Sequence, residues 1–343
     1  MQVKTFGGDP MEARQWDEFV ARNEQATSDH LWGWRRILSE SFGYRPIYLG
    51  AIEGDRLTGI LPLFLIPRGF RRVALSSIPF GNYGGICADS KEAALALLHE
   101  AKELLHREKA DYLELRHQVP LPDKTLQPQR LYNRFRLPLT GDPEIHFRQL
   151  NSTSRKRITR SVHTGLRLVV SRDVGLLYPI HLHTFRRLGS PCFPRRYFEL
   201  ILEEFPGSTE IYFVVFQNLH IAYHLNLFFK NSLVSQLGGS LAHFQKHNPM
   251  YFLYWCEIQE GCARGLKELD RCRSRPDSGS AEHKRWLRMV EEPLGYQYYL
   301  PNGNGLPQRN PSNPKYQWLI RTWQHLPIPL TQLIGPRVVR YLA

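Results

Sequence analysis

Two stretches of this sequence carry the same pattern, and that repeat constrains the fold more than any other feature. They start at residues 47 and 211, 164 residues apart, and read IYLGAIEGDRLTGILPLFL and IYFVVFQNLHIAYHLNLFF without a gap. Each has an apolar run, a short turn and a second apolar run, and the turns fall at Gly54-Asp55 and at Asn218-Leu219. Period-2 patterning on both sides of a two-residue turn predicts a β-hairpin in each stretch.

The segments that follow the two hairpins also correspond. A short apolar run and a Gly-Gly pair come next, with Gly84-Gly85 in the first half and Gly238-Gly239 in the second. Helical periodicity then predicts helices over 91–109 and 249–264, and strand patterns follow at 111–116 and 266–271. Two copies of one α+β unit are the economical explanation for this order.

The same pattern divides the chain into two domains and a tail. A broken, proline-containing stretch over 119–143 separates the halves, so we expect an N-terminal domain over 1–150 and a C-terminal domain over 151–305. Helices are predicted to open each half, at 11–23 and 30–41, and then at 153–164, 176–188 and 195–204. The prolines of the tail, 306–343, exclude one long helix. The tail either packs on the body or touches a membrane surface.

Composition limits the compartment and the partners. Lys plus Arg number 45 against 32 for Asp plus Glu, and the resulting charge of +13 favours nucleic acid, an acidic membrane face or a phosphate-rich substrate. Five cysteines without a C-x-x-C spacing indicate neither a zinc site nor a disulfide framework. The sequence shows no signal-peptide shape and no apolar run of transmembrane length. These features predict a cytoplasmic protein, with the inner face of the membrane as its place if the tail binds there.

The stretch from Arg271 to Trp286 carries the strongest functional pattern. It reads RCRSRPDSGSAEHKRW and follows a predicted strand. A polar, glycine-containing segment with several cations after a strand suits an anionic or carbonyl-bearing ligand. A solvated basic loop is the alternative.

Taken in order, the motifs resemble the FemAB-like family, in which the GNAT acyltransferase fold occurs twice. Within that family the sequence looks most similar to the FemAB-related proteins of exosortase/PEP-CTERM systems. The segments that carry the resemblance are His30–Trp34, Gly59–Leu63, Ser76–Phe80, Tyr83–Gly85, Arg155–Arg160 with Gly165-Leu166, Gly238-Gly239, Arg273–Trp286, and Asn313-Pro314 with Leu326–Thr331 and Gly335-Pro336.

This resemblance implies two tandem GNAT-like domains and an acyltransferase of class EC 2.3. The implied reaction is N-acyl or aminoacyl transfer to an amine of a peptidoglycan, exopolysaccharide or other cell-envelope precursor, which is a small or lipid-linked molecule. No cofactor is expected to stay bound, and the co-substrate is aminoacyl-tRNA or acyl-CoA. The pyrophosphate loop Q/R-x-x-G-x-G/A of acetyl-CoA-dependent members is not found, since its nearest match, Gln236–Leu241, fails at the last position.

Functions other than this acyl or aminoacyl transfer remain open. An acyl-CoA-dependent N-acetyltransferase is one. A non-catalytic protein that binds an envelope precursor is another, because the family's Phe-Lys pair is His283-Lys284 here and its Trp-Gly pair is Trp286-Leu287. A nucleic-acid-binding regulator rests on net charge alone. The oligomeric state is not indicated.

The resemblance assigns Lys284 to the neighbourhood of the acceptor, and a surface lysine is the alternative. Arg273 and Ser274 would shape the same pocket, Ser278 and Gly279 would make a tight turn, and Gly238-Gly239 would contact the substrate. His224 and Asp270 are candidate proton acceptors, although a core histidine and a paired carboxylate are the simpler interpretations.

The remaining candidates are cationic. Arg155 and Arg160 share a helical spacing that suits a polyanion, or else a solvated helix face. His181-x-His183 is too sparse for a metal site, and we expect no bound metal.

Overall fold

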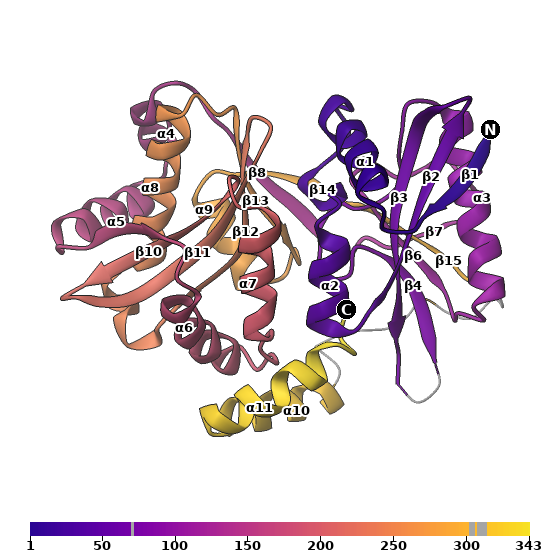
Figure 1. Ribbon diagram of the computed structural model, residues 1–343. Coiled ribbons are helices and arrows are strands. Elements are labelled where there is room, and N and C mark those ends of the chain that lie inside the picture. Colours follow the sequence, from indigo (N-terminus) through magenta and orange to yellow (C-terminus); the bar gives the residue numbers. More distant parts are fainter. Residues whose placement is uncertain (70–71, 302–305, 307–313) are drawn as a thin grey trace. The chain divides into compact units, whose positions relative to one another are not determined.

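The computed structural model describes residues 1–69, 72–301, 306 and 314–343 (Figure 1). Contacts divide the chain into two compact units. The first comprises Met1–Leu131, Pro293–Arg309 and Arg337–Ala343, and the second comprises Tyr132–Glu292 and Asn310–Pro336. Each unit has its own mixed sheet and its own helices, so the fold is α+β in both.

Unit 1 begins with a strand and two helices and ends with a strand that returns from much later in the sequence. Its elements are β1 Gln2–Phe6, α1 Pro10–Arg22, a 3-10 turn at Ser28–His30, α2 Trp34–Phe42, β2 Arg45–Glu53, β3 Arg56–Pro67, β4 Val73–Ser77, β5 Cys87–Ala88, α3 Lys91–Arg107, β6 Leu113–His117, β7 Gln127–Pro128 and β15 Gly295–Tyr299.

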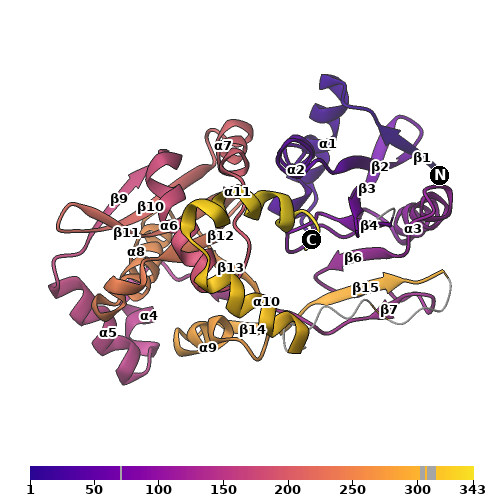
Figure 2. The same cartoon turned by 90° about the horizontal axis from the view of Figure 1, so that it is seen from below.

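The sheet of unit 1 runs β1-β2-β3-β4-β6-β15-β7. Its pairs are antiparallel except for β4 and β6, which are parallel. Strand β15 pairs with β6 and β7, and Figure 2 shows it beside them.

Alternation along β2 explains why helices cover both faces of this sheet. Ile47, Leu49 and Ala51 pack with the apolar face of α3 in one core cluster. Tyr48, which points the other way, contacts Trp16 of α1 with ring centroids 4.8 Å apart. A strand with two buried faces reads as a continuous apolar run, which is the pattern of residues 47–52.

Unit 2 repeats this order with more helices. Its elements are β8 Asn133–Pro138, α4 Pro143–Gln149, α5 Ser152–His163, β9 Arg167–Ser171, α6 Val174–Arg187, α7 Arg195–Glu204, β10 Thr209–Phe216, β11 Leu219–Phe229, β12 Ser232–Ser240, a 3-10 turn (η2) at Ala242–His247, α8 Pro249–Ala263, β13 Glu268–Ser274, α9 Gly279–Trp286, β14 Val290–Pro293, α10 Pro314–His325 and α11 Ile328–Val339.

The sheet of unit 2 runs β14-β8-β13-β12-β11-β10-β9. Helices α6 and α7 lie on one face of it, and α4, α5 and α8 lie on the other (Figure 1). Helix α8 is buried almost all round, which explains why its apolar pattern is less regular than that of α3.

The predicted hairpins are β2–β3 and β10–β11, and the repeat is confirmed as structure with one shift. The second turn is Gln217-Asn218 rather than Asn218-Leu219, and both residues have positive φ, 48° and 64°, as a tight hairpin turn requires. A bulge interrupts both hairpins, between Ala51 and Ile52 and between Val214 and Val215. Corresponding positions of the two hairpins are therefore one residue closer in sequence than the gap-free alignment places them.

Strand pairing places the unit boundaries differently from the sequence pattern. Residues 132–150 go with unit 2 because β8 pairs antiparallel with β13. Strand β15 lies in the stretch expected to be the C-terminal domain, yet it completes the sheet of unit 1. The chain thus crosses between the units twice before the tail instead of once.

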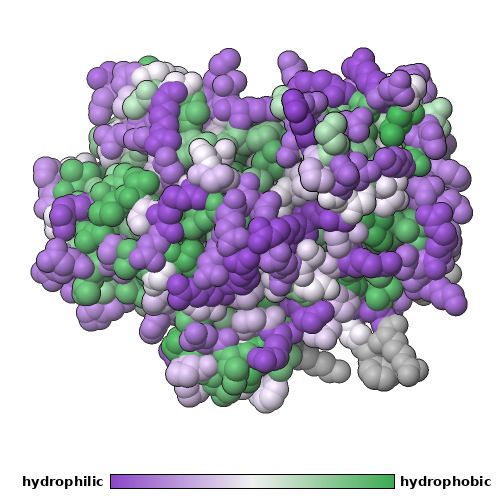
Figure 3. Space-filling model, viewed as in Figure 1, coloured by the Kyte–Doolittle hydropathy of each residue, from purple (hydrophilic) through white to green (hydrophobic). Residues whose placement is uncertain are grey.

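The tail forms α10 and α11, which meet at Leu326-Pro327. This agrees with the expectation that prolines prevent one long helix; Asn313 of the family-like motif lies outside the described residues. Apolar side chains stay exposed beside polar ones over these two helices (Figure 3). Among the described residues, no helix is long and apolar enough to cross a membrane.

Candidate active site

Two parallel strands of unit 2 separate partway along their length. Strand β13 pairs with β12 only from Ser232–Val234 to Glu268–Asp270, although β12 continues to Ser240 and β13 to Ser274. Beyond Val234 the backbone groups on this edge of β12 therefore have no ladder partner on β13. Backbone N–H groups that are free of a ladder can bind a carbonyl oxygen that gains negative charge.

A buried charged cluster stands at this separation. It joins His224 of β11, Glu257 of α8 and Arg271 of β13. Glu257 accepts from His224 Nδ1 at 2.6 Å and from a terminal nitrogen of Arg271 at 2.6 Å, and Ser235 Oγ donates to it at 3.2 Å. The side chains of His224, Glu257 and Arg271 are almost entirely enclosed, with exposures of 3%, 0% and 8%.

Electrostatics fixes the protonation of this cluster. Burial alone would raise the pKa of Glu257, but His224 and Arg271 lower it to about 2, so the carboxylate is charged. Burial and the charge of Arg271 lower the pKa of His224. A neutral ring can donate from Nδ1 to Glu257 and accept at Nε2 from Arg271, 3.1 Å away. His224 is thus a core histidine that orients Arg271, as the simpler interpretation of its sequence position holds.

The Gly-Gly pair provides the space for this arrangement. A Cβ on Gly238 would lie 2.3 Å from the His224 ring, and a Cβ on Gly239 would lie 2.7 Å from Thr184 Oγ1 of α6. Both glycines are therefore required where side chains from the two faces of the sheet come closest to β12. The first unit has a similar contact, because a Cβ on Gly85 would lie 2.3 Å from the His117 ring.

Lys284 is buried rather than exposed, with 6% of its surface accessible. Its ammonium donates to the carbonyl oxygen of Arg271 at 2.6 Å and to Ser274 Oγ at 2.8 Å, and it lies 5.0 Å from the centre of the Phe135 ring. Burial lowers the pKa of Lys284 to about 7. The lysine therefore holds the part of β13 that has left β12.

The backbone of β13 bends at this point. Cys272 has φ of 57°, and the register with β8 shifts between Asp270 and Arg273. Asp270 stabilises the bend, because it accepts from the N–H of Cys272 at 2.7 Å and from Arg134 Nε at 2.9 Å. Its carboxylate is paired, which matches the simpler of its two sequence interpretations.

The other predicted residues fall into two groups. Ser274 shares a contact with Ser280 at 3.1 Å, and Arg273 lies over the Tyr132 ring at 4.4 Å, both beside the bend. Ser278 caps α9 by accepting from the N–H of Ala281, and Gly279 is the first residue of that helix, so the expected tight turn is a helix start.

Arg155 and Arg160 lie apart from the site, on α5. Arg155 donates to the carbonyl oxygens of Arg148 and Leu150, so it braces the turn before its own helix. Arg160 is exposed.

Of the two positions that depart from the family pattern, His283 is half-buried and Leu287 is buried. The ring of His283 meets Tyr251 edge to face at 4.7 Å, and its Nε2 is buried with no hydrogen-bond partner among the described residues. Burial lowers the pKa of His283 to about 3. Leu287 is 1% exposed, and its carbonyl oxygen accepts from Tyr254.

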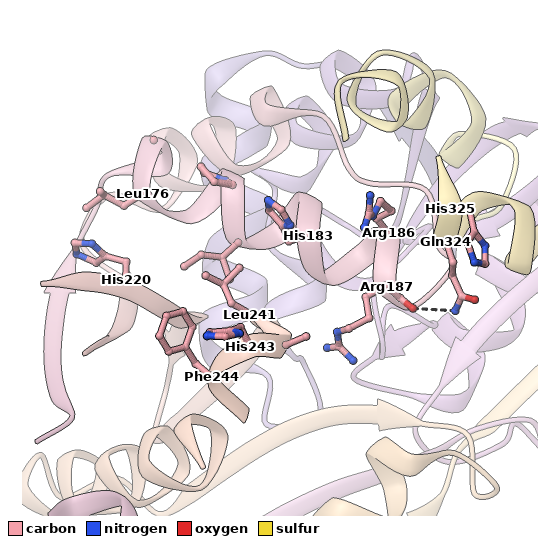
Figure 4. Close-up of a pocket in the computed structure, with 14 residues that line it drawn as sticks. Leu176, His183, Arg186, Arg187, His220, Leu241, His243, Phe244, Gln324 and His325 are labelled. Atoms are coloured by element: carbon pink, nitrogen blue, oxygen red, sulfur yellow. Dashed lines mark hydrogen bonds between the residues drawn. The ribbon is translucent and has the colours of Figure 1, made fainter. Parts of the chain in front are cut away.

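A groove of about 840 Å³ lies on the α6 side of unit 2 (Figure 4). Its walls come from α6, the start of β11, η2 and α10. The described polar and charged side chains that line it are His183, Arg186, Arg187, His220, His243, Gln324 and His325, with apolar contacts from Leu176, Pro179, Ile180, Leu241 and Phe244. No carboxylate occurs among these residues, so the groove suits an anionic group attached to an apolar one.

Unit 1 contains a comparable separation of strands, but its polar groups are already paired. Parallel pairing of β4 with β6 ends at Ser76 and Glu114. Glu114 binds Arg116 at 3.1 Å and accepts from Ser76 and from Tyr298 at 2.8 Å each. The carboxylate of Asp29 accepts from the N–H groups of Asn82 and Tyr83 at 2.5 and 2.7 Å. An anion from outside would have to displace the carboxylate of Asp29 from these N–H groups.

Comparison with known families decides the nature of unit 2. Residues 148–285 match the family model described as an acetyltransferase (GNAT) domain. Unit 2 contains a GNAT domain. The match includes every member of the charged cluster and also the bend of β13, and it indicates an acyltransferase. No curated protein sequence matches the chain.

Solved structures show that both units have this fold. A crystal structure of FemX superimposes with a TM-score of 0.68 at 14% identity, covering 93% of this chain and 100% of that chain. A tandem GNAT protein from the clavulanic acid biosynthesis pathway gives 0.55 at 12% identity, with coverage of 89% and 99%. The C-terminal domain of a putative lysylphosphatidylglycerol synthetase from Agrobacterium fabrum gives 0.57 at 12%, with coverage of 85% and 92%. The predicted tandem GNAT-like fold is confirmed; at these identities the likeness concerns the fold alone.

Several residues of the GNAT domain were not found from the sequence. Glu257 could have been recognised, because it is a single carboxylate near the end of an otherwise apolar helical run, 249–258. Arg271 was recognised only as the start of a basic stretch. The groove histidines come from four separate elements, so no local pattern joins them. Within the described ranges, no group of three or more His, Cys, Asp or Glu residues is placed to hold a metal ion.

Proposed function

We propose that the GNAT domain transfers an acyl or aminoacyl group to an amine where β12 and β13 separate. The observation that carries the proposal is the loss of pairing beyond Val234, next to the buried His224–Glu257–Arg271 cluster. The free edge of β12 supplies donors for an oxyanion. The cluster and Lys284 hold the two strands in that arrangement, so His224, Glu257, Arg271 and Lys284 act as positioning residues.

The proposed reaction requires little beyond orientation. An uncharged amine attacks the carbonyl carbon of the donor, a C–N bond forms, and the carbonyl oxygen becomes an oxyanion that accepts from backbone N–H groups of β12. The C–S bond of a thioester, or the C–O bond of an aminoacyl ester, then breaks. The leaving thiol or hydroxyl group takes the proton that the amine gives up.

An acyl-CoA thioester is the donor that the GNAT domain match supports, and aminoacyl-tRNA is the alternative donor. For the acceptor we propose an amine on an anionic or lipid-linked cell-envelope precursor. Support comes from the groove, which Arg186, Arg187 and several histidines line together with apolar side chains and without a carboxylate. The net charge of +13 favours the same class of partner.

The test measures transfer from acetyl-CoA and from aminoacyl-tRNA, separately, to amino-sugar acceptors with and without a phosphate. We expect Arg271→Gln to lower kcat by about tenfold or more, because a shift of β13 disturbs the oxyanion site. Arg187→Gln should raise KM for the phosphorylated acceptor and leave kcat unchanged. Arg14→Gln, a 77% exposed arginine of unit 1, is the matched control. Absence of transfer from both donors would rule the proposal out.

A non-catalytic precursor-binding protein is the second candidate, and the cationic lining of the groove favours it. In that case the phosphorylated acceptor would raise the melting temperature, Arg187→Gln would abolish the shift, and neither donor would be consumed. Consumption of either donor in step with the acceptor would reject this candidate.

A further inference from the structure

The end of the chain in unit 2 exposes large apolar side chains. Trp318 is 66% exposed, Leu319 53% and Leu330 38%, and Leu188 at the end of α6 is 54% exposed. Figure 3 shows apolar residues gathered with polar ones over α10 and α11. We call Leu188, Trp318, Leu319 and Leu330 the tail face. Exposed tryptophan and leucine in such a set mark an interaction surface.

The opposite sides of these helices are well anchored, so the exposure does not come from loose packing. Ile320 fills the space above Gly189, and Gln324 donates to the carbonyl oxygen of Arg187 at 2.9 Å. Arg186 donates to the carbonyl oxygen of Leu326 at 3.1 Å, and Cys192 contacts Gly335 and Thr331. The fold is held by these inner contacts, and the tail face is left available for a partner.

Charge identifies the partner. The last acidic residue of the sequence is Glu292, and the 51 residues after it contain five Lys or Arg and no Asp or Glu. Arg321 is exposed on α10, three residues after Trp318 and therefore on the same side of the helix, and Arg187 is exposed beside Leu188. Tryptophan, leucine and cations without carboxylates are the composition of a segment that lies in the interface of an anionic bilayer.

We propose that the tail face docks the protein on an anionic lipid bilayer. The apolar side chains enter the boundary between headgroups and acyl chains, and Arg187 and Arg321 contact the headgroup phosphates. The helices lie on the surface and do not span it, since no described helix is long and apolar enough to cross. This inference stands whether or not the protein transfers an acyl group.

Docking would also place the groove at the membrane. Gln324 and His325 of α10 line the groove, and the tail face begins on the same helix (Figure 4). The headgroup of a lipid-linked precursor could then enter the groove while its chain stays in the bilayer. This consequence, unlike the docking, rests on the proposed function.

The experiment is co-sedimentation of the full chain with vesicles of phosphatidylcholine alone or with about 30 mol% phosphatidylglycerol. We expect binding to the anionic vesicles that weakens as salt increases. Leu319→Ala combined with Trp318→Ala should reduce bound protein by about fivefold or more, and Arg321→Glu should reduce it further. The matched controls are Leu219→Ala, at the 56% exposed first position of β11, and Arg14→Glu.

Three outcomes would overturn the docking: wild-type protein that stays in the supernatant at low salt, a loss with Leu219→Ala equal to that of the combined Trp318→Ala and Leu319→Ala variant, or binding that salt does not affect. Melting curves show whether each variant is folded. Transfer to a water-soluble acceptor should not change in the Trp318 and Leu319 variants. Failure of docking and failure of the proposed reaction are therefore separate results.

Discussion

At the scale of single residues, the core of unit 2 depends on Glu257. Its carboxylate is 0% exposed and has two buried partners, His224 and Arg271. Glu257→Gln should lower the free energy of unfolding by roughly 3–5 kcal/mol, because it leaves the Arg271 guanidinium buried without its counter-charge. Glu260→Gln, in an i,i+4 pair with Arg264 on the outer side of the same helix, should cost less than about 0.5 kcal/mol. Urea unfolding measures both, and equal losses would contradict the role given to Glu257.

At the same scale, the lowered pKa of Lys284 predicts how the free energy of unfolding depends on pH. The folded protein loses this proton near pH 7, whereas the unfolded chain keeps it until about pH 10.5. Between these values the unfolded state binds more protons, so the free energy of unfolding should rise with pH by up to ~1.4 kcal/mol per unit. Lys284→Met keeps the stem beside Phe135 and removes this slope. Urea unfolding at pH 7 to 9.5 compares the two, and an unchanged slope would show that Lys284 stays charged when folded.

At the scale of elements, substitution by alanine should change stability in opposite directions at Gly238 of β12 and at Gly279 of α9. In Gly238→Ala the new methyl group meets the His224 ring, so β11 or the ring must move, and the expected cost is about 1–3 kcal/mol together with lost transfer activity. Gly279→Ala meets nothing within 4 Å and lies in the first turn of α9, so it should stabilise the protein by about 0.5–1 kcal/mol. Thermal melting distinguishes the two signs.

The elements also show what a sequence can and cannot reveal. The hairpins, the Gly-Gly pairs and the helices that follow them were predictable because alternation and periodicity are local. The shift at Gln217-Asn218 was not, because the apolar runs on both sides of the turn show the same alternation when the two turn residues move by one position. The sequence also did not show which sheet β8 and β15 join. A strand of five or six residues can pair with either sheet, and only the tertiary structure determines which one it joins.

The candidate site also has a part that the sequence shows and a part that only the structure shows. The sequence analysis named Lys284, His224, Asp270 and Ser274 as candidates, but it did not identify the partners that these side chains have in the structure. The lysine was expected to face a ligand or the solvent, and it instead holds the carbonyl oxygen of Arg271. A sequence identifies residues able to do chemistry, and only the packing shows which of them are already engaged.

At the scale of the whole molecule, buried histidines should make folding sensitive to acid. Burial lowers the pKa of His117 in unit 1, and of His181 and His283 in unit 2, to about 3. From pH 6.5 down to 3 the unfolded chain binds these protons and the folded chain does not. The free energy of unfolding should therefore fall as pH falls through this window, by up to ~1.4 kcal/mol per unit for each histidine.

His283→Phe tests this argument with the residue that the FemAB-like pattern carries at this position. The phenyl ring keeps the edge-to-face contact with Tyr251 and removes a buried nitrogen that has no partner among the described residues. We expect a gain of about 1–3 kcal/mol at pH 7 and a shallower loss toward pH 4.5, because one acid-sensitive group is gone. His99→Gln, at an exposed position of α3, is the control and should leave the profile unchanged. Parallel pH profiles for wild type and His283→Phe would mean that His283 is already protonated in the folded protein.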